Sequence, residues 1–322
     1  MARFRYAAGL WIVGGAKDRF VEYRPPVDLQ TMLHRIQQVE HIEAVEIPYV
    51  GPFDIDATRR ELERAGLAAC SLITGTINGP RWKFGSLSCL DESLRWAAVD
   101  EVKQTCDAAV AMGCNRVTVW MGQDGFDYPF QLDYGGAWDR LVRSLGEVCA
   151  YAPEVLVGLE YKPKEPRTHS LLSNVDKTIL ACEEVGASNL GIVLDFGHSL
   201  NAGENPAEAA TTAASRGRLF FVHMNDNYRE WDDDLVPGTV HVWETLEFLF
   251  QLKALNYDGW ISVDQAPRRE DPAKAAVQAI RNLEALARLA ESIDVEQLRA
   301  MQGSCRIDDI MAYLSRLLLG ET

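Results

Sequence analysis

Short apolar runs alternate with longer amphipathic segments along most of the chain. The apolar runs have the composition of β-strands, and the segments between them carry apolar residues at helical spacing. This alternation is typical of a parallel sheet built from β/α units. The eight expected strands are residues 6–13, 44–50, 68–74, 116–122, 155–161, 191–197, 219–225 and 259–265.

Eight alternating units in about 290 residues favour a closed barrel over an open doubly wound sheet. No G-x-G-x-x-G sequence follows the first apolar run, and no second composition zone appears along the chain. We therefore expect an α/β fold in which residues 1–290 form a (β/α)8 TIM barrel catalytic domain. Residues 291–322 again show helical spacing and predict a short C-terminal helical extension. This extension would pack on the barrel or, as we favour, on a neighbouring subunit.

Composition narrows the choice of partners and compartment. The formal net charge is −15 without a local basic patch, which argues against a nucleic-acid partner. No apolar run reaches the ~18 residues that span a bilayer, so no membrane association is expected. The seven cysteines are scattered without C-x-x-C spacing, which is typical of reduced thiols in a cytoplasmic protein.

Ionisable residues end each of the last four expected strands. The carboxyl ends of barrel strands meet at one mouth, where the chemistry of such barrels is found. Carboxylates crowded there would repel one another in a low dielectric, and a divalent cation would resolve the conflict. Oxygen ligands with one or two imidazoles suit Mn²⁺, Co²⁺ or Mg²⁺. The residues concerned are Glu160 and Lys162, Asp195 and His198, His223, and Asp264.

A second acidic feature, YREWDDDLVPG at residues 228–238, follows the seventh strand. In an extended backbone Asp232 and Asp234 face one side and Asp233 faces the other. Asp232 and Asp234 could therefore hold a second cation together with His198.

Six motifs resemble, in order, those of the xylose isomerase family, over about residues 4–290. They are GLWIVGGAKDRF (9–20), VWMGQDG (119–125), LEYKPKEPR (159–167), FGHSLNAG (196–203), WDDDLVPG (231–238) and VDQAPRRED (263–271). The resemblance implies two divalent-metal sites, a lysine that bonds the oxygen on the first carbon of the substrate, and two aromatic walls of a sugar pocket. By position these are Glu160, Asp195 and Asp264 for the first metal; Asp195, His198, Asp232 and Asp234 for the second; Lys162 for the oxygen; and Trp11 and Trp120 for the walls.

The chain departs from xylose isomerases at four places. His223 stands where they carry aspartate and Asp195 where they carry glutamate, and both changes resemble the L-rhamnose isomerase branch. The second strand, EIPYVGPFD, lacks the His and Asp pair that opens the cyclic sugar, and the C-terminal arm is shorter.

These observations together predict a metal-dependent sugar isomerase that interconverts an aldose and a ketose by a 1,2-hydride shift. We expect Mn²⁺ first, with Co²⁺ or Mg²⁺ as alternatives, one or two ions per subunit, a small sugar as substrate, and a homodimer or homotetramer. Glu165 and Arg167 would form a salt bridge or orient Lys162, with a contact to the substrate as the alternative. The expected catalytic residues are Lys162, Glu160, Asp264 and His198; the substrate-binding residues are Trp11, Trp120, Lys162 and His198; and the metal ligands are Glu160, Asp195, His223, Asp264, His198, Asp232 and Asp234.

Other reaction classes fit the same residue types. Glu160 and Asp264 are placed to exchange a proton with a substrate carbon, as in a sugar epimerase that works through an enediolate. A lyase acting on oxidised (3-keto) glycosides would reuse the same metal site. An endonuclease acting at damaged DNA is disfavoured, because such enzymes carry a basic face and more histidine ligands. This chain has a net charge of −15 and only six histidines.

Overall fold

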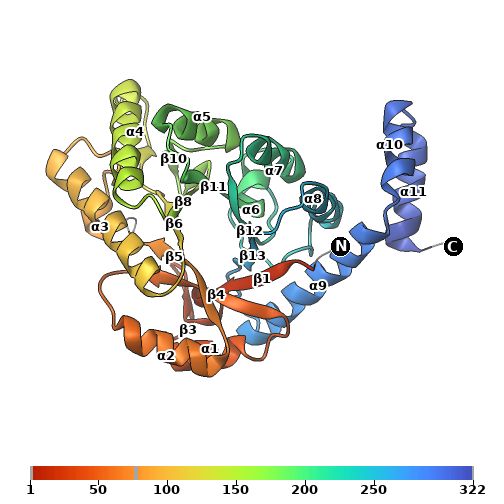
Figure 1. Cartoon of the computed structure of the whole chain (residues 1–322), viewed down its shortest axis with the longest axis horizontal. Helices are drawn as coiled ribbons and strands as arrows, with labels where there is room; N and C mark the ends of the chain where they lie inside the picture. The colour runs from red at the N-terminus through yellow and green to blue at the C-terminus, as the bar shows by residue number, and fades with distance from the viewer. Residues whose placement is uncertain (1–2, 76–78, 321–322) are drawn as a thin grey trace.

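The computed structural model describes residues 3–75 and 79–320, and its centre is a closed parallel barrel (Figure 1). The strands close in the order β1-β13-β12-β11-β8-β6-β5-β4, which confirms the expected (β/α)8 fold. The barrel strands are β1 (Arg5–Gly9), β4 (Ile42–Tyr49), β5 (Ala68–Thr74), β6 (Arg116–Trp120), β8 (Leu156–Glu160), β11 (Leu190–Asp195), β12 (Leu219–Met224) and β13 (Trp260–Val263).

Helices surround the barrel, and short strands decorate its loops. The helices are α1 (Leu29–Ile36), α2 (Ile55–Ala65), α3 (Glu92–Ala111), α4 (Tyr134–Tyr151), α5 (Val175–Val185), α6 (Phe196–Asn201), α7 (Pro206–Ser215), α8 (Val242–Ala254) and α9 (Pro272–Ser292), with the 3-10 helices η1 (Leu10–Val13) and η2 (Pro80–Trp82). Two small sheets pair β2 (Ala16–Lys17) with β3 (Glu22–Arg24), and β7 (Gly125–Phe126) with β10 (Thr168–Ser170) and β9 (Lys164–Glu165).

The first strand is shorter than the sequence predicted, because the apolar run 6–13 divides in two. β1 ends at Gly9, and η1 turns the chain so that the amide of Gly14 donates to the carbonyl of Trp11 at 3.0 Å. A Cβ on Gly9 would lie 2.3 Å from the Trp11 ring. Only glycine at position 9 therefore lets the indole fold back over the end of the strand.

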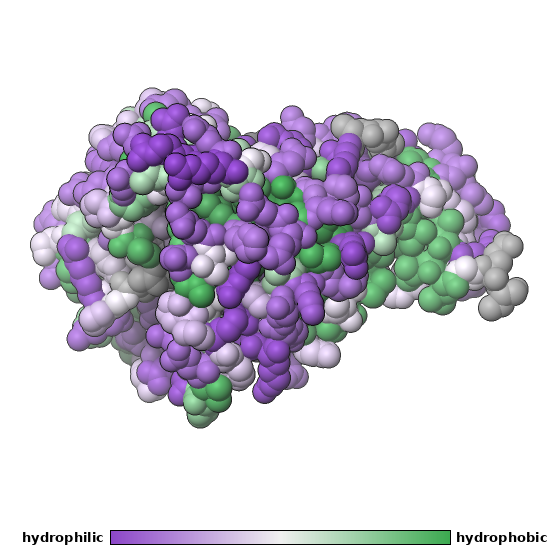
Figure 2. Space-filling model, turned by 90° about the horizontal axis from the view of Figure 1, so that it is seen from below, coloured by the Kyte–Doolittle hydropathy of each residue, from purple (hydrophilic) through white to green (hydrophobic). Residues whose placement is uncertain are grey.

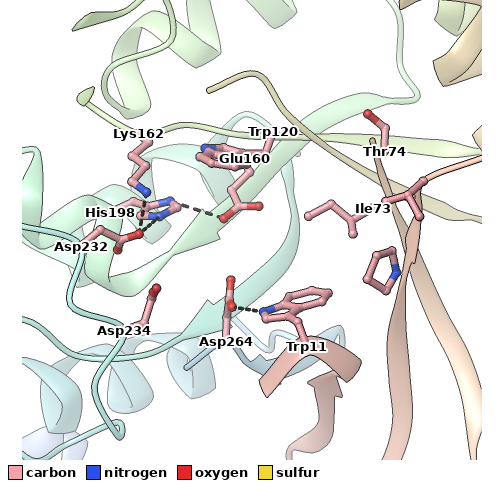
Figure 3. A pocket seen from close by; sticks show the side chains of 12 residues that line it. Trp11, Ile73, Thr74, Trp120, Glu160, Lys162, His198, Asp232, Asp234 and Asp264 are labelled. Atoms are coloured by element: carbon pink, nitrogen blue, oxygen red, sulfur yellow. Dashed lines mark hydrogen bonds and ion pairs between the residues drawn. The ribbon is translucent and has the colours of Figure 1, made fainter. Parts of the chain in front are cut away.

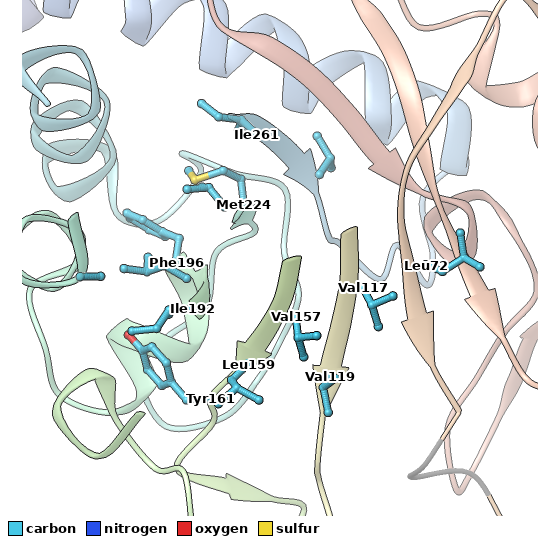
Figure 4. Packing of buried hydrophobic residues seen from close by; sticks show 14 of the residues in the cluster. Leu72, Val117, Val119, Val157, Leu159, Tyr161, Ile192, Phe196, Met224 and Ile261 are labelled. Atoms are coloured by element: carbon cyan, nitrogen blue, oxygen red, sulfur yellow. The ribbon is translucent and has the colours of Figure 1, made fainter. Parts of the chain in front are cut away.

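Buried apolar side chains form two separate groups in the fold. The larger group lies between strands and helices and includes Val157 and Leu159 of β8 (Figure 4). Because side chains alternate along a strand, Gly158 and Glu160 of β8 face the opposite way, into the barrel. A second, smaller apolar group comprises Ala7, Ala44, Cys70, Val193, Phe221 and Trp260.

Most helices that follow a barrel strand begin at an Asp or Asn whose side chain accepts a backbone N–H of the first turn. Part of the acidity of the chain is therefore used to start helices, and Asp195 is the capping residue that also lies in the ligand cluster at the barrel mouth. The capping residues are Asp28, Asp54, Asp91, Asp133, Asn174, Asp195, Asn205 and Asp271.

Two buried aspartates hold the long loops at the mouth. Asp124 accepts the amides of Ser86 and Ser88 at 3.0 and 2.7 Å, which ties the loop after β5 to the loop after β6. Asp226 accepts the amides of residues 239–241 at 2.8–3.0 Å. The loop that carries Asp232 and Asp234 is thus closed at its base.

The chain ends in a helical hairpin of α10 (Val295–Gly303) and α11 (Ile307–Leu319), which projects from the side of the barrel (Figure 1). Ile307, Met311 and Leu319 are 66, 63 and 76% exposed. Figure 2 shows hydrophobic residues gathered at this end of the molecule. That the extension packs on a neighbouring subunit stays a prediction. No helix in the described part of the chain is both long and apolar enough to cross a membrane.

The hairpin predicts a measurable effect on assembly. If α11 covers a second copy of the chain, the double variant Ile307→Glu, Met311→Glu should lower the molar mass to that of the monomer, because two charges would enter an apolar contact. Light scattering after size exclusion measures the molar mass. Gln302→Glu, at an exposed position of α10, is the control. An unchanged mass, or a wild type that is already monomeric, would contradict the expectation.

Candidate metal centre

Four potential ligands come together at the carboxyl ends of consecutive barrel strands. Glu160 ends β8, Asp195 ends β11, His223 lies in β12 opposite Asp195, and Asp264 follows β13. One ligand atom from each of them lies within 4.8 Å of the others. The structure thus assembles the quartet that the sequence placed on the last four strands.

The quartet carries three carboxylates, and no lysine or arginine of the described residues forms an ion pair with any of them. Asp195 is fully buried. Burial, together with the nearby carboxylates of Glu160 and Asp264, raises its pKa to about 7 against the opposing effect of His198. Three crowded acids of this kind need either protons or a cation.

His223 completes the fit to a cation. Its Nδ1 lies 3.4 Å from Oε1 of Glu160 and 3.3 Å from Oδ2 of Asp264, and it is buried without a hydrogen-bond partner. Carboxylate oxygens plus one imidazole nitrogen match the ligand preferences of Mn²⁺, Co²⁺ and Mg²⁺ better than those of a structural zinc site. The residues present therefore fit a divalent metal.

Further contacts hold two of the four ligands. Asp195 caps α6, and its Oδ1 accepts the amide of His198 at 2.7 Å while its Oδ2 accepts Nδ2 of Asn225 at 2.8 Å. Oδ1 of Asp264 accepts Nε1 of Trp11 at 2.6 Å (Figure 3). The short η1 turn after Gly9 brings this indole to Asp264.

A buried ammonium group lies beside the quartet. Lys162, only 5% exposed, donates from Nζ to Oδ2 of Asp232 at 2.6 Å and also pairs with Glu165. Burial alone would lower the pKa of Lys162, but the carboxylates of Asp232 and Glu165 outweigh it and raise the pKa above its usual value. Its Nζ also lies 5.0 Å from the centre of the Trp120 ring. Lys162 therefore remains a cation.

Glu165 has the supporting position that the sequence predicted, whereas Arg167 does not orient Lys162. Arg167 instead pairs with Asp127 at 2.8 Å, and its side chain is 72% exposed. Sequence proximity suggested the wrong partner, because β9 and β10 turn the chain away after Glu165.

The loop after β12 brings Asp232 and Asp234 to the cavity wall, while Asp233 accepts the amide of Tyr228. Nε2 of His198 lies 3.4 Å from Oδ2 of Asp232. Among described residues the cluster of mutually close ligand atoms does not extend to Asp232 and Asp234, and Asp232 is paired with Lys162 instead. The second cation stays a prediction.

Burial and neighbouring charges shift the pKa values of His198, Asp232 and Asp234. Burial lowers the pKa of His198, but Asp195 and Asp232 raise it to about 9. Burial raises the pKa of Asp232, but His198 and Lys162 hold it well below the usual range. Burial, with Asp232 and Asp264 nearby, raises the pKa of Asp234 well above its usual value.

These side chains surround a cavity of about 320 Å³, which is at the small end of the ~300–1,000 Å³ range of ligand pockets. Trp11 and Trp120 form parts of its wall, as the resemblance implied (Figure 3). The remaining wall was not anticipated from the sequence. It is formed by Pro48, Val50, Ile73 and Thr74 at the ends of β4 and β5.

Sequence reasoning also missed Glu46, a fully buried acid of β4. Its Oε1 lies 2.9 Å from Nε2 of His223. The available signal was a single acid within the apolar run AVEIPYV. Burying an unpaired charge in a strand is costly, so an acid at this position indicates that it has a specific partner.

Fold and site together define a TIM barrel with a candidate divalent-metal centre at the mouth where such barrels carry their chemistry. The family model described as xylose isomerase-like TIM barrel matches residues 36–289. The chain belongs to this family.

Similar proteins with named activities are sugar isomerases and epimerases. A xylose isomerase of Thermus thermophilus is 25% identical over 286 residues, which cover 83% of this chain and 74% of that protein. A solved L-ribulose 3-epimerase superposes with a TM-score of 0.70 at 19% identity, covering 91% of this chain and 99% of its own. A 3-keto-D-glucoside 4-epimerase from E. coli gives 0.67 at 19% identity, covering 88% and 100%.

The packing around Asp195 predicts that Gly197→Ala weakens metal binding. A Cβ at position 197 would lie 1.8 Å from Oδ1 of Asn225, so the Asn225 side chain must move away from Asp195. We expect the dissociation constant for Mn²⁺, measured by calorimetry, to rise about 10-fold or more, as for other residues that orient ligands. Gly146→Ala in α4, where a Cβ meets nothing within 4 Å, is the control and should bind as the wild type does. Unchanged affinity in Gly197→Ala would contradict the role of Asn225.

Proposed function

We propose that the protein is a divalent-metal-dependent sugar isomerase that interconverts an open-chain aldose and its ketose by a 1,2-hydride shift. Hydrogen moves with its electron pair from the second carbon to the first, while one proton passes from the oxygen on the second carbon to the oxygen on the first. Atoms and electrons balance without an external oxidant or reductant.

The quartet Glu160, Asp195, His223 and Asp264 would hold the cation, with Mn²⁺ as the first candidate. A divalent cation supplies Lewis-acid polarisation of the sugar oxygens when it is bound. Trp11 and Trp120 would enclose the carbon chain and exclude water, which strengthens every charge interaction in the cavity.

Lys162 is the observation that carries the proposal. Its ammonium is buried at the cavity wall and is held by Asp232 and Glu165, so its position is fixed before substrate arrives. Donation to the oxygen on the first carbon would stabilise the negative charge that develops there during transfer. A second cation near His198 and Asp232 would add to this effect.

The alternative is a sugar epimerase, the activity for which several structural neighbours are named. Proton transfer through an enediolate needs a carboxylate oxygen that is free to approach carbon. Oδ1 of Asp264 is bonded to Trp11, and Oδ2 faces His223 in the metal cluster. Asp264 therefore has less freedom to act as a base, which favours the hydride shift. A lyase acting on 3-keto glycosides remains a further alternative at the same site.

Replacing the lysine should affect catalysis and spare metal binding. For Lys162→Met we expect kcat to fall about 10²–10³-fold, the usual loss of one donor to a developing oxyanion, with Mn²⁺ affinity within a few-fold of wild type. Initial rates of ketose formation, from aldoses of both hand series, measure this. Lys164→Met in exposed β9 is the matched control. Full activity of Lys162→Met would remove the basis of the proposal.

Solvent isotope incorporation separates the two reaction classes. In D₂O a hydride shift retains the transferred hydrogen, so the ketose should carry almost no deuterium at its first carbon. Mass spectrometry and proton NMR of the product measure the label. Stoichiometric incorporation at the reacting carbon would show proton transfer and would favour the epimerase type of chemistry.

A further inference from the structure

We propose that Glu46 is a positioning residue that orients the imidazole of His223 for metal binding. Nothing in the family motifs of the chain involves this residue, because it lies inside the second strand and away from every strand end. The inference rests on the metal site of the proposed function and is independent of the reaction that the protein catalyses.

The geometry places Glu46 on the far side of the imidazole from the other ligands. Oε1 of Glu46 lies 2.9 Å from Nε2 of His223, whereas Nδ1 faces Glu160 and Asp264 at 3.4 and 3.3 Å. The approach to Nε2 is an ion-pair contact and departs from linear hydrogen-bond geometry. One ring nitrogen thus meets Glu46, and the other meets the candidate cation site.

Glu46 is itself held in place by hydroxyl groups. Its Oε1 accepts Oγ of Ser262 from β13 at 2.6 Å, and its Oε2 lies 3.5 Å from Oγ1 of Thr118 in β6. Oγ of Ser71 in β5 is 3.0 Å from the same Thr118 hydroxyl. These residues share the barrel interior and are fully buried. The carboxylate therefore has little freedom to turn away from His223.

Stability alone does not account for an acid at this position. Neither lysine nor arginine pairs with Glu46 in the described ranges. A buried carboxylate loses the solvation it has in water, and an apolar residue of similar volume would avoid that loss. A negative charge beside Nε2 favours the proton on that nitrogen, which leaves the lone pair of Nδ1 for a cation. A carboxylate behind a ligating histidine is a general device for fixing the ring and its tautomer.

The test is metal affinity of the full chain in the absence of sugar. After chelator treatment, Mn²⁺ is titrated into the wild type, Glu46→Gln and Glu46→Leu, and free Mn²⁺ is followed by electron paramagnetic resonance. We expect the dissociation constant to rise about 10-fold for Gln and towards 100-fold for Leu, as when other groups behind ligands are removed. Pulsed resonance of bound Mn²⁺ should also show weaker coupling to the imidazole nitrogen. A purely structural role would leave that coupling unchanged.

Two controls make the result decisive. Thr178→Ala removes a buried hydroxyl that donates to the carbonyl of Asn174 at the start of α5, outside the network around Glu46, and it should bind Mn²⁺ within about twofold of wild type. Ser262→Ala removes one restraint on Glu46 and leaves Glu46 and His223 in place. It should weaken Mn²⁺ binding by a few-fold. This variant tests the proposal even if the Glu46 variants fold poorly. Wild-type affinity in a folded Glu46 variant, or in Ser262→Ala if neither folds, would overturn the proposal. A wild type that binds Mn²⁺ but isomerises no sugar would refute the proposed function alone.

Discussion

The arrangement of the barrel mouth depends on one electrostatic constraint, the convergence of Glu160, Asp195 and Asp264. Two unit charges about 4 Å apart interact by about 4 kcal/mol at an effective dielectric of 20, so three ionised carboxylates cannot share this space without compensation. The pKa of Asp195, raised to about 7, shows that a proton is one solution. A divalent cation is the other, and Nδ1 of His223, which is buried without a hydrogen-bond partner, is placed to bind it.

The mouth keeps its ammonium group apart from these acids. Lys162 lies next to Glu160 in the cavity wall, yet its ion pairs are with Glu165 and Asp232. A lysine that paired with the quartet would cancel one of its negative charges and weaken its attraction for a cation. The cavity wall therefore has a candidate metal-binding part and an ammonium part, and both line the same cavity.

The fold and the quartet could be predicted because each depends on local pattern plus the closure of a barrel. Alternating periodicity identified the eight strands, and strand ends placed Glu160 and Asp264 at the same mouth. Contacts between distant segments could not be predicted in this way. Glu46 meets His223 across the barrel interior, and the turn of Trp11 away from β1 requires the glycine at position 9. Arg167 pairs with Asp127 because two short strands, not sequence proximity, decide its neighbours.

The bond from Trp11 to Asp264 connects the fold to the type of chemistry. Related barrels with named activities include both isomerases and epimerases, so the barrel alone does not decide between hydride and proton transfer. The difference lies in whether a carboxylate at the mouth keeps a lone pair free to reach a substrate carbon. In this chain the indole takes one oxygen of Asp264 and the metal cluster faces the other, while the fixed charge of Lys162 is available to an oxygen of the substrate. This distribution favours stabilising charge on oxygen over removing a proton from carbon.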